Sequence, residues 1–210
     1  MALRSLKSNR ITYTALLQAC EACVQWSFAL SLFSRMCQRT VDMDTMVYNA
    51  AFQACAAGEF ATSWTVTMDL FSDMLHRSHL PDVVSYTVLM GICLKCHRWE
   101  LALVLWIRMR RQQLRPDSSI FTSAIAAHAM GGQWRQAIDL LWGMTSCGVG
   151  HHIAAFGASM SACEQSTCWE HSLQLLLDAA CVQVEPDSLL YGNALTSCQK
   201  AHRWDWALEL

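Results

Sequence analysis

The chain has 210 residues, of which 53% are hydrophobic and 15% are charged, and its formal net charge is −2. Such an apolar composition excludes a disordered chain, and the slightly acidic balance gives no global electrostatic signal for nucleic acid or anionic membranes. No apolar run approaches the roughly 18 residues that would indicate a membrane span. The 11 cysteines come without a secretory signal peptide, which favours buried thiols in a reducing compartment over a disulfide framework.

Residues 1–9 form a short N-terminal extension, too short to identify as a transit peptide. After it, aromatic residues recur at steps of 35, 38, 35, 35 and 35, at Tyr13, Tyr48, Tyr86, Phe121, Phe156 and Tyr191. The residue seven positions further on is a cysteine in five of six cases, at Cys20, Cys55, Cys93, Cys163 and Cys198, with His128 as the exception. Tryptophans follow 13 residues after the aromatic, or 16 in the second case, at Trp26, Trp64, Trp99, Trp134, Trp169 and Trp204.

These recurrences predict a repeat array over residues 10–210. Five repeats are complete and a sixth is partial, with bounds 10–44, 45–82, 83–117, 118–152, 153–187 and 188–210. Apolar residues spaced as on one face of a helix follow each aromatic, and a second helical pattern opens at the tryptophan. We therefore expect an all-α fold, an α-solenoid of stacked antiparallel helix pairs.

Prolines mark the ends of three repeats, and each is followed by an aspartate. The three, which are all the prolines of the chain, are Pro81, Pro116 and Pro186. Proline cannot extend a helix, and an aspartate beside the next helix start suits the positive end of its dipole.

The third repeat, with "VVSYTVLM", "RWELALVLWIRMRRQQL" and "RPD", resembles the pentatricopeptide repeat. The resemblance covers residues 10–210 and implies binding of single-stranded RNA, one base per repeat, read by two or three side chains. It also implies that the helix pairs form a right-handed superhelix, and it places the protein in a mitochondrion or chloroplast. The residues themselves form no catalytic constellation, so we expect no catalytic residue, no cofactor, no metal and no membrane or small-molecule partner. A role in RNA processing, stability or translation follows from the same resemblance.

By that resemblance, the fifth and last residues of each repeat read the base. These pairs are Thr14 and Asp44, Asn49 and Asp82, Thr87 and Asp117, Thr122 and His152, and Gly157 and Asp187. The second residue sandwiches the base, and these residues are Ile11, Met46, Val84, Ser119 and Ala154. Of these, Ser119 and Ala154 are poor sandwich residues.

An ionised aspartate only accepts hydrogen bonds, so it favours guanine or uracil, which present a ring N–H. In the family, threonine at the fifth position accompanies purines and asparagine accompanies pyrimidines. The first three repeats are therefore expected to read G, U and G. His152 and Gly157 depart from the pattern, so the later repeats are expected to contribute packing more than base selectivity.

Other readings weigh less. The pattern Cys93-x-x-Cys96-His97 has the spacing of a c-type haem attachment, but Cys93 occupies the repeated cysteine position and therefore predicts a core residue. The cluster Arg108, Arg110, Arg111 and Arg115 predicts either phosphate contacts or a solvated helix face.

The alternative function is a helical-repeat scaffold for protein partners. Because the array stops inside its sixth repeat, the chain is expected to be a fragment or to have exposed ends.

Overall fold

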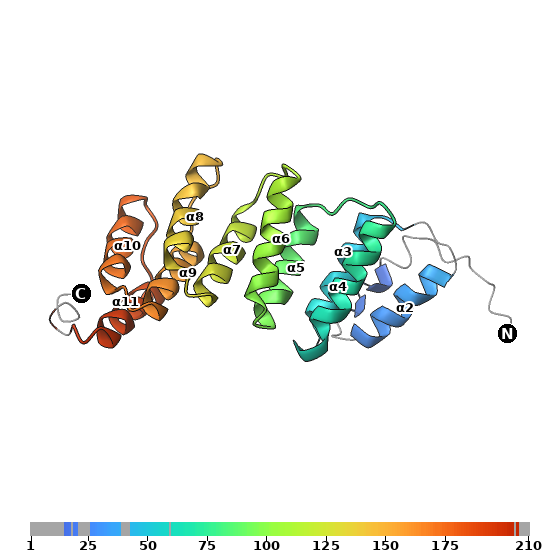
Figure 1. The fold of residues 1–210 in the computed structure, drawn as a ribbon, viewed down its shortest axis with the longest axis horizontal. Helices are drawn as coiled ribbons and strands as arrows, with labels where there is room; N and C mark the ends of the chain where they lie inside the picture. Colours follow the sequence, from blue (N-terminus) through green and yellow to red (C-terminus); the bar gives the residue numbers. More distant parts are fainter. Residues whose placement is uncertain are drawn as a thin grey trace. The chain divides into compact units, whose positions relative to one another are not determined.

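The computed structural model describes residues 15–17, 19–20, 26–38, 43–58, 60–203 and 205. Within these residues every regular element is a helix (Figure 1). The structure divides into an N-terminal part, Met1–Cys96, and a C-terminal part, His97–Leu210. None of the described helices is both long and apolar enough to cross a membrane.

The N-terminal part is built around one central helix, α3. Its helices are α2 (Trp26–Gln38), α3 (Thr45–Ala56), α4 (Phe60–His76) and α5 (Val83–Lys95). Helix α3 packs against the other three, and α4 also packs against α5. The first helix of the second repeat thus contacts both its own partner and the first helix of the third repeat.

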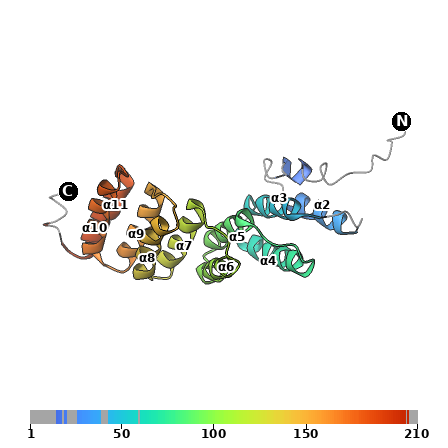
Figure 2. The ribbon, with the colours of Figure 1, turned by 90° about the horizontal axis from the view of Figure 1, so that it is seen from above.

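The C-terminal part continues the same arrangement. Its helices are α6 (Trp99–Arg111), α7 (Ser118–Met130), α8 (Trp134–Ser146), α9 (Ile153–Gln165), α10 (Trp169–Cys181) and α11 (Ser188–Lys200). The first helices α7, α9 and α11 pack in a row, while α8 and α10 each pack against the first helices before and after them. The turned view of Figure 2 shows this succession within the part. The expected all-α class, a stack of antiparallel helix pairs, is confirmed.

Most helices end at a residue with left-handed backbone conformation. One set of these residues recurs every 35 residues with φ between 54° and 67°, at His97, Gly132, Thr167 and His202. The next N–H then bonds back to the carbonyl five residues earlier, as Gln133 N does to His128 O at 2.9 Å. This Schellman geometry satisfies carbonyls that the helix end would leave unpaired, and so each turn is short.

The repeated aromatic positions lie in the core. Tyr48, Tyr86, Phe121 and Phe156 are all at most 1% exposed. Each contacts an aromatic ring of the preceding second helix, with ring centroids 5.2 to 6.2 Å apart; the partner rings are Phe33, Phe71, Trp106 and Trp142. Helix α10 has leucines in that region, and the sixth aromatic, Tyr191, is correspondingly 41% exposed.

The tryptophans that open second helices pack between consecutive repeats. The ring of Trp99 lies against Gly131, so close that a Cβ atom at Gly131 would be 2.9 Å from it. The ring of Trp134 lies 4.5 Å from the ring of His171 in the next repeat. These contacts give the two tryptophans a role in packing between repeats.

One tryptophan does not open its helix as the sequence pattern predicted. Helix α4 starts at Phe60, so Trp64 lies one turn inside it, and α4 has 17 residues where α6, α8 and α10 have 13. The three extra residues of the second repeat are therefore accommodated mainly as an added helical turn. Apolar and small residues such as Phe60 and Ala61 continue the helix pattern more readily than they form a loop.

The contact between Trp99 and Gly131 can be tested by adding a methyl group. Gly131→Ala forces the rigid indole to move, and we expect a loss of about 1–3 kcal/mol in the free energy of unfolding. Gly143→Ala in α8 is the matched control, because no atom lies within 4 Å of its added Cβ and alanine favours a helix by about 0.5–1 kcal/mol. Chemical denaturation followed by circular dichroism measures both, and equal effects would contradict this packing.

Candidate nucleic-acid interface

The aspartates at the repeat ends cap the first helices. Asp44, Asp82, Asp117 and Asp187 each precede a first helix with extended backbone, and each side chain accepts a hydrogen bond from the third residue of that helix. The distances from the amide nitrogen to Oδ1 are 3.1, 2.8, 2.9 and 3.0 Å. Such a cap contributes about 0.5–2 kcal/mol, and it fixes the carboxylate at the start of the helix.

The second repeat brings its fifth and last residues into direct contact. Asn49 lies one turn into α3, and Asp82 caps α5. Asn49 Nδ2 donates to both carboxylate oxygens of Asp82, at 3.2 and 3.3 Å. Because α3 packs beside α5, two residues that are 33 positions apart in sequence form one polar site.

A third residue of this site, Ser85, was not anticipated from the sequence. Its hydroxyl is buried and lies 2.6 Å from Asn49 Oδ1 and 2.9 Å from Asp82 Oδ1. By donating to Asn49 Oδ1, Ser85 turns the amide so that Nδ2 faces Asp82. One feature of the sequence could have identified Ser85. At the equivalent position other repeats have an apolar residue, namely Val47, Ile120 and Leu190.

The fourth repeat forms a similar pair with different chemistry. Thr122 Oγ1 lies 3.3 Å from His152 Nε2 and donates its own hydrogen to Ser118 O at 2.9 Å. A hydroxyl has one hydrogen, so Thr122 can only accept from His152, and the imidazole must be protonated at Nε2. Although His152 occupies the capping position, its side chain makes no capping hydrogen bond.

A hollow of about 560 Å³ surrounds the pair in the fourth repeat. Its lining residues are Asp117, Ser118, Ser119, Thr122, Ser123, His152 and Ala154. The structure thus brings together both residues expected to read the fourth base and the second residues of two consecutive repeats, Ser119 and Ala154. With only small side chains at those two positions, the hollow is open to solvent.

The remaining candidate residues are less completely assembled. Thr87 lies in α5 and donates to Val83 O at 2.8 Å, whereas Asp117 belongs to the C-terminal part. Gly157 is buried without a side chain, and its carbonyl accepts from Asn193 Nδ2 at 3.4 Å. Met46 and Val84 are 65% and 49% exposed on their helices. Thr14 and Ile11 lie outside the described residues.

The cysteines of the haem-like pattern belong to the packing. Cys93 is fully buried, and burial, with a smaller contribution from Cys96, raises the pKa of its thiol to about 12. Burial likewise raises the pKa of Cys55 to about 11 and that of Cys163 to about 12. Among the described residues, no three His, Cys, Asp or Glu side chains gather to hold a metal ion.

The fold and the polar sites along successive helices define a helical-repeat protein of the α-solenoid class. The sequence model described as "PPR repeat" matches residues 11–41, 84–114 and 119–149. These three segments, which lie in the first, third and fourth repeats, are therefore similar in sequence to the pentatricopeptide repeat.

A curated relative is the pentatricopeptide repeat-containing protein 1, apicoplast, of Plasmodium falciparum. It is 29% identical over 101 residues, which are 48% of this chain and 16% of the relative. The chain thus spans less than a fifth of that relative's length.

Solved structures share the fold at low sequence identity. The pentatricopeptide repeat protein PPR10 from maize has a TM-score of 0.67 and 21% identity over 98% of this chain and 29% of its own. The PPR domain of Arabidopsis thaliana protein-only RNase P 1, solved in complex with tRNA, has a TM-score of 0.73 and 14% identity over 92% of this chain and 99% of its own. PPR10 has also been solved with an 18-nt psaJ RNA element, where the TM-score is 0.58 and the identity 16%.

The tautomer of His152 is a direct test of the geometry in the fourth repeat. We expect nitrogen-15 NMR of the imidazole to show a protonated Nε2 at neutral or higher pH, because Thr122 offers only an acceptor. Thr122→Val, of nearly equal shape, should remove this preference and yield mixed tautomers. Ser123→Val is the control, since Ser123 bonds only within its own helix. A predominant Nδ1–H form in the unchanged protein would contradict the assignment.

Proposed function

We propose that the chain binds single-stranded RNA along the row of its first helices. The observation that carries the proposal is the pairing of Asn49 with Asp82, repeated in kind by Thr122 with His152. Both pairs join the fifth residue of one first helix to the capping residue of the next, so each of these two repeats offers a polar site between consecutive first helices. Support comes from PPR10, which has been solved with RNA, and from the PPR domain solved with tRNA.

The second repeat is proposed to read uracil. One oxygen of Asp82 is engaged in capping α5, and the carboxylate can accept only, which suits the ring N–H of uracil or guanine. Asn49 at the fifth position distinguishes the pyrimidine by the pattern of the family. Thr14 with Asp44, and Thr87 with Asp117, are proposed to read guanine, giving the order G, U, G.

The fourth and fifth repeats are proposed to discriminate weakly. With Nε2 protonated towards Thr122, a neutral His152 leaves only the Nδ1 lone pair as an acceptor. That uncharged acceptor is weaker than the carboxylate of the other repeats. Gly157 leaves Asp187 without a fifth-position partner side chain.

The cellular role is proposed from the relatives. A relative with an apicoplast name supports an organellar setting, which we place in a mitochondrion or chloroplast, with RNA processing, stability or translation as the process affected. We propose that this array binds RNA and does not itself catalyse a reaction.

A protein scaffold is the second candidate. Met46 and Val84 are exposed apolar residues on first helices, and such residues suit a protein surface as well as the face of a base. Filter binding separates the two functions. An RNA-binding array retains single-stranded RNA in preference to duplex and loses affinity steeply with salt, whereas a scaffold retains neither.

Replacing the fifth residue of the second repeat tests the reading of bases. Asn49→Thr should move the preference at the second base from U towards G by about tenfold, equivalent to about 1.4 kcal/mol. Asn193→Thr is the matched control, because Asn193 lies outside every fifth position. Selection of bound sequences from a random RNA pool measures both variants, and an unchanged second preference for Asn49→Thr would exclude the assignment.

We expect Ser85 to increase the selectivity of the second repeat for U over C, although Ser85 itself does not contact the base. Ser85→Ala frees Asn49 Oδ1, so the amide can rotate and present either its donor or its acceptor beside Asp82. We expect the ratio of affinities for U and C at the second base to fall several-fold. Restoration by Ser85→Thr, which keeps the hydroxyl, distinguishes this positioning role from a general loss of stability. Equal ratios in Ser85→Ala and the unchanged protein would contradict it.

A further inference from the structure

The arginine-rich end of α6 is not accounted for by base reading. Arg108, Arg110 and Arg111 lie in the last turn of α6, and Arg115 follows in the turn towards α7. Positive charge at a helix C-terminus complements the helix dipole, which is a sufficient reason for charges in the last turn. It does not explain Arg115, which lies beyond the helix, nor the direction that Arg110 takes.

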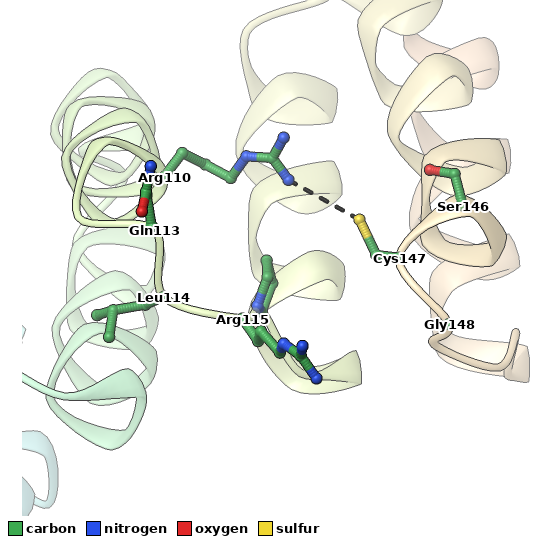
Figure 3. A pocket seen from close by; sticks show the side chains of 8 residues that line it. Arg110, Gln113, Leu114, Arg115, Ser146, Cys147 and Gly148 are labelled. Atoms are coloured by element: carbon green, nitrogen blue, oxygen red, sulfur yellow. Dashed lines mark hydrogen bonds between the residues drawn. The ribbon is translucent and has the colours of Figure 1, made fainter.

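Arg110 extends away from its own helix towards the next helix pair. Figure 3 shows its guanidinium reaching across a hollow towards Cys147, at the end of α8. Arg110 Nη1 lies 3.9 Å from Cys147 Sγ, and the guanidinium carbon lies 5.7 Å from the centre of the Trp106 ring. The indole face thus supports the guanidinium, and the thiol is only a weak acceptor that an anion can displace.

The hollow has a volume of about 580 Å³ and two walls. One wall is the turn after α6, with Arg110, Gln113, Leu114, Arg115 and Pro116, and the other is Ser146, Cys147 and Gly148. No carboxylate lines it, and neither Arg110 nor Arg115 forms an ion pair within the described part of the chain. Two guanidinium groups facing an open, acid-free hollow suit a phosphate group, which they bind through paired N–H donors.

This hollow adjoins the one expected to hold the fourth base. Pro116 lines the first and Asp117 lines the second, and these two residues are consecutive. A strand with a base beside Thr122 and His152 therefore has backbone phosphates within reach of the arginine hollow. We infer that Arg110 and Arg115 form an oxyanion site that takes a phosphodiester of the bound RNA next to the fourth base. The inference rests on the proposed RNA binding, but the site itself can be tested without RNA.

Charge-removing variants measure the contact through its salt dependence. Arg110→Gln and Arg115→Gln should each lower affinity for single-stranded RNA several-fold and reduce the slope of log affinity against log salt by about 0.7. The preference for bases in the second repeat should stay unchanged, because a phosphate carries no sequence information. Arg135→Gln is the matched control, since Arg135 lies in the first turn of α8, at the other end of the helix from Cys147. An effect equal to that of the control would overturn the inference.

Cys147 provides a local readout of occupancy. It is exposed and lines the hollow, whereas Cys181 is exposed at the end of α10, outside it. We expect single-stranded RNA to slow alkylation of Cys147 by iodoacetamide, measured by mass spectrometry, and to leave Cys181 unchanged. Arg110→Gln combined with Arg115→Gln should abolish this protection.

A parallel titration with pyrophosphate separates the two possible sources of phosphate. If RNA binds and protects Cys147, the inference is supported. If RNA binds but only pyrophosphate protects Cys147, the site serves a free phosphate compound and the assignment to RNA is overturned. If RNA binds and neither ligand protects Cys147, the site is overturned while the proposed function stands. If RNA fails to bind, the proposed function fails, and protection by pyrophosphate alone then supports an oxyanion site independent of RNA.

Discussion

The capping hydrogen bond of the repeat-end aspartates is the constraint on which the rest of the arrangement depends. In each case one carboxylate oxygen accepts the amide of the third helical residue, which starts the helix and holds the acid in one orientation. Since α3 packs beside α5 and α9 packs beside α11, the same bond places Asp82 and Asp187 beside the first helix of the preceding repeat. In the second repeat, the hydrogen bond that caps α5 thus also fixes the carboxylate of the polar site that Asp82 forms with Asn49.

The hydrogen bonds around Asn49 and Thr122 show how neighbouring residues narrow the chemistry of such a site. Ser85 decides which end of the Asn49 amide faces Asp82, and the carbonyl of Ser118 decides that Thr122 accepts from His152. In both cases the deciding group belongs to neither member of the pair. A description of each site by its fifth and last residues alone therefore omits one hydrogen bond in each of these two repeats.

Periodicity alone predicted the all-α class, the helix pairs and the core positions, because the packing of helix on helix repeats with the residues that make it. It predicted that Cys93 belongs to the core, and the buried thiol confirms this. It could not place the added turn of α4, since Trp64 keeps its type while its place in the helix changes. Nor could it predict the contact of Ser85 with Asn49 or that of Arg110 with Cys147. The residues of these two contacts are 36 and 37 positions apart in the sequence, respectively.

Where the last residue of a pair is an aspartate, it caps a helix in addition to its place in the pair, whereas the fifth residue caps nothing. The two positions therefore differ in how far a substitution affects the stability of the fold. A substitution at Asp82 or Asp117 removes a helix cap, so it weakens the fold whatever its effect on a bound ligand. A substitution at Asn49, Thr122 or Gly157 falls inside a helix and leaves every cap intact. Under the proposed function, a change of base preference is therefore most accessible through the fifth residues, because the capping aspartates then stay unchanged.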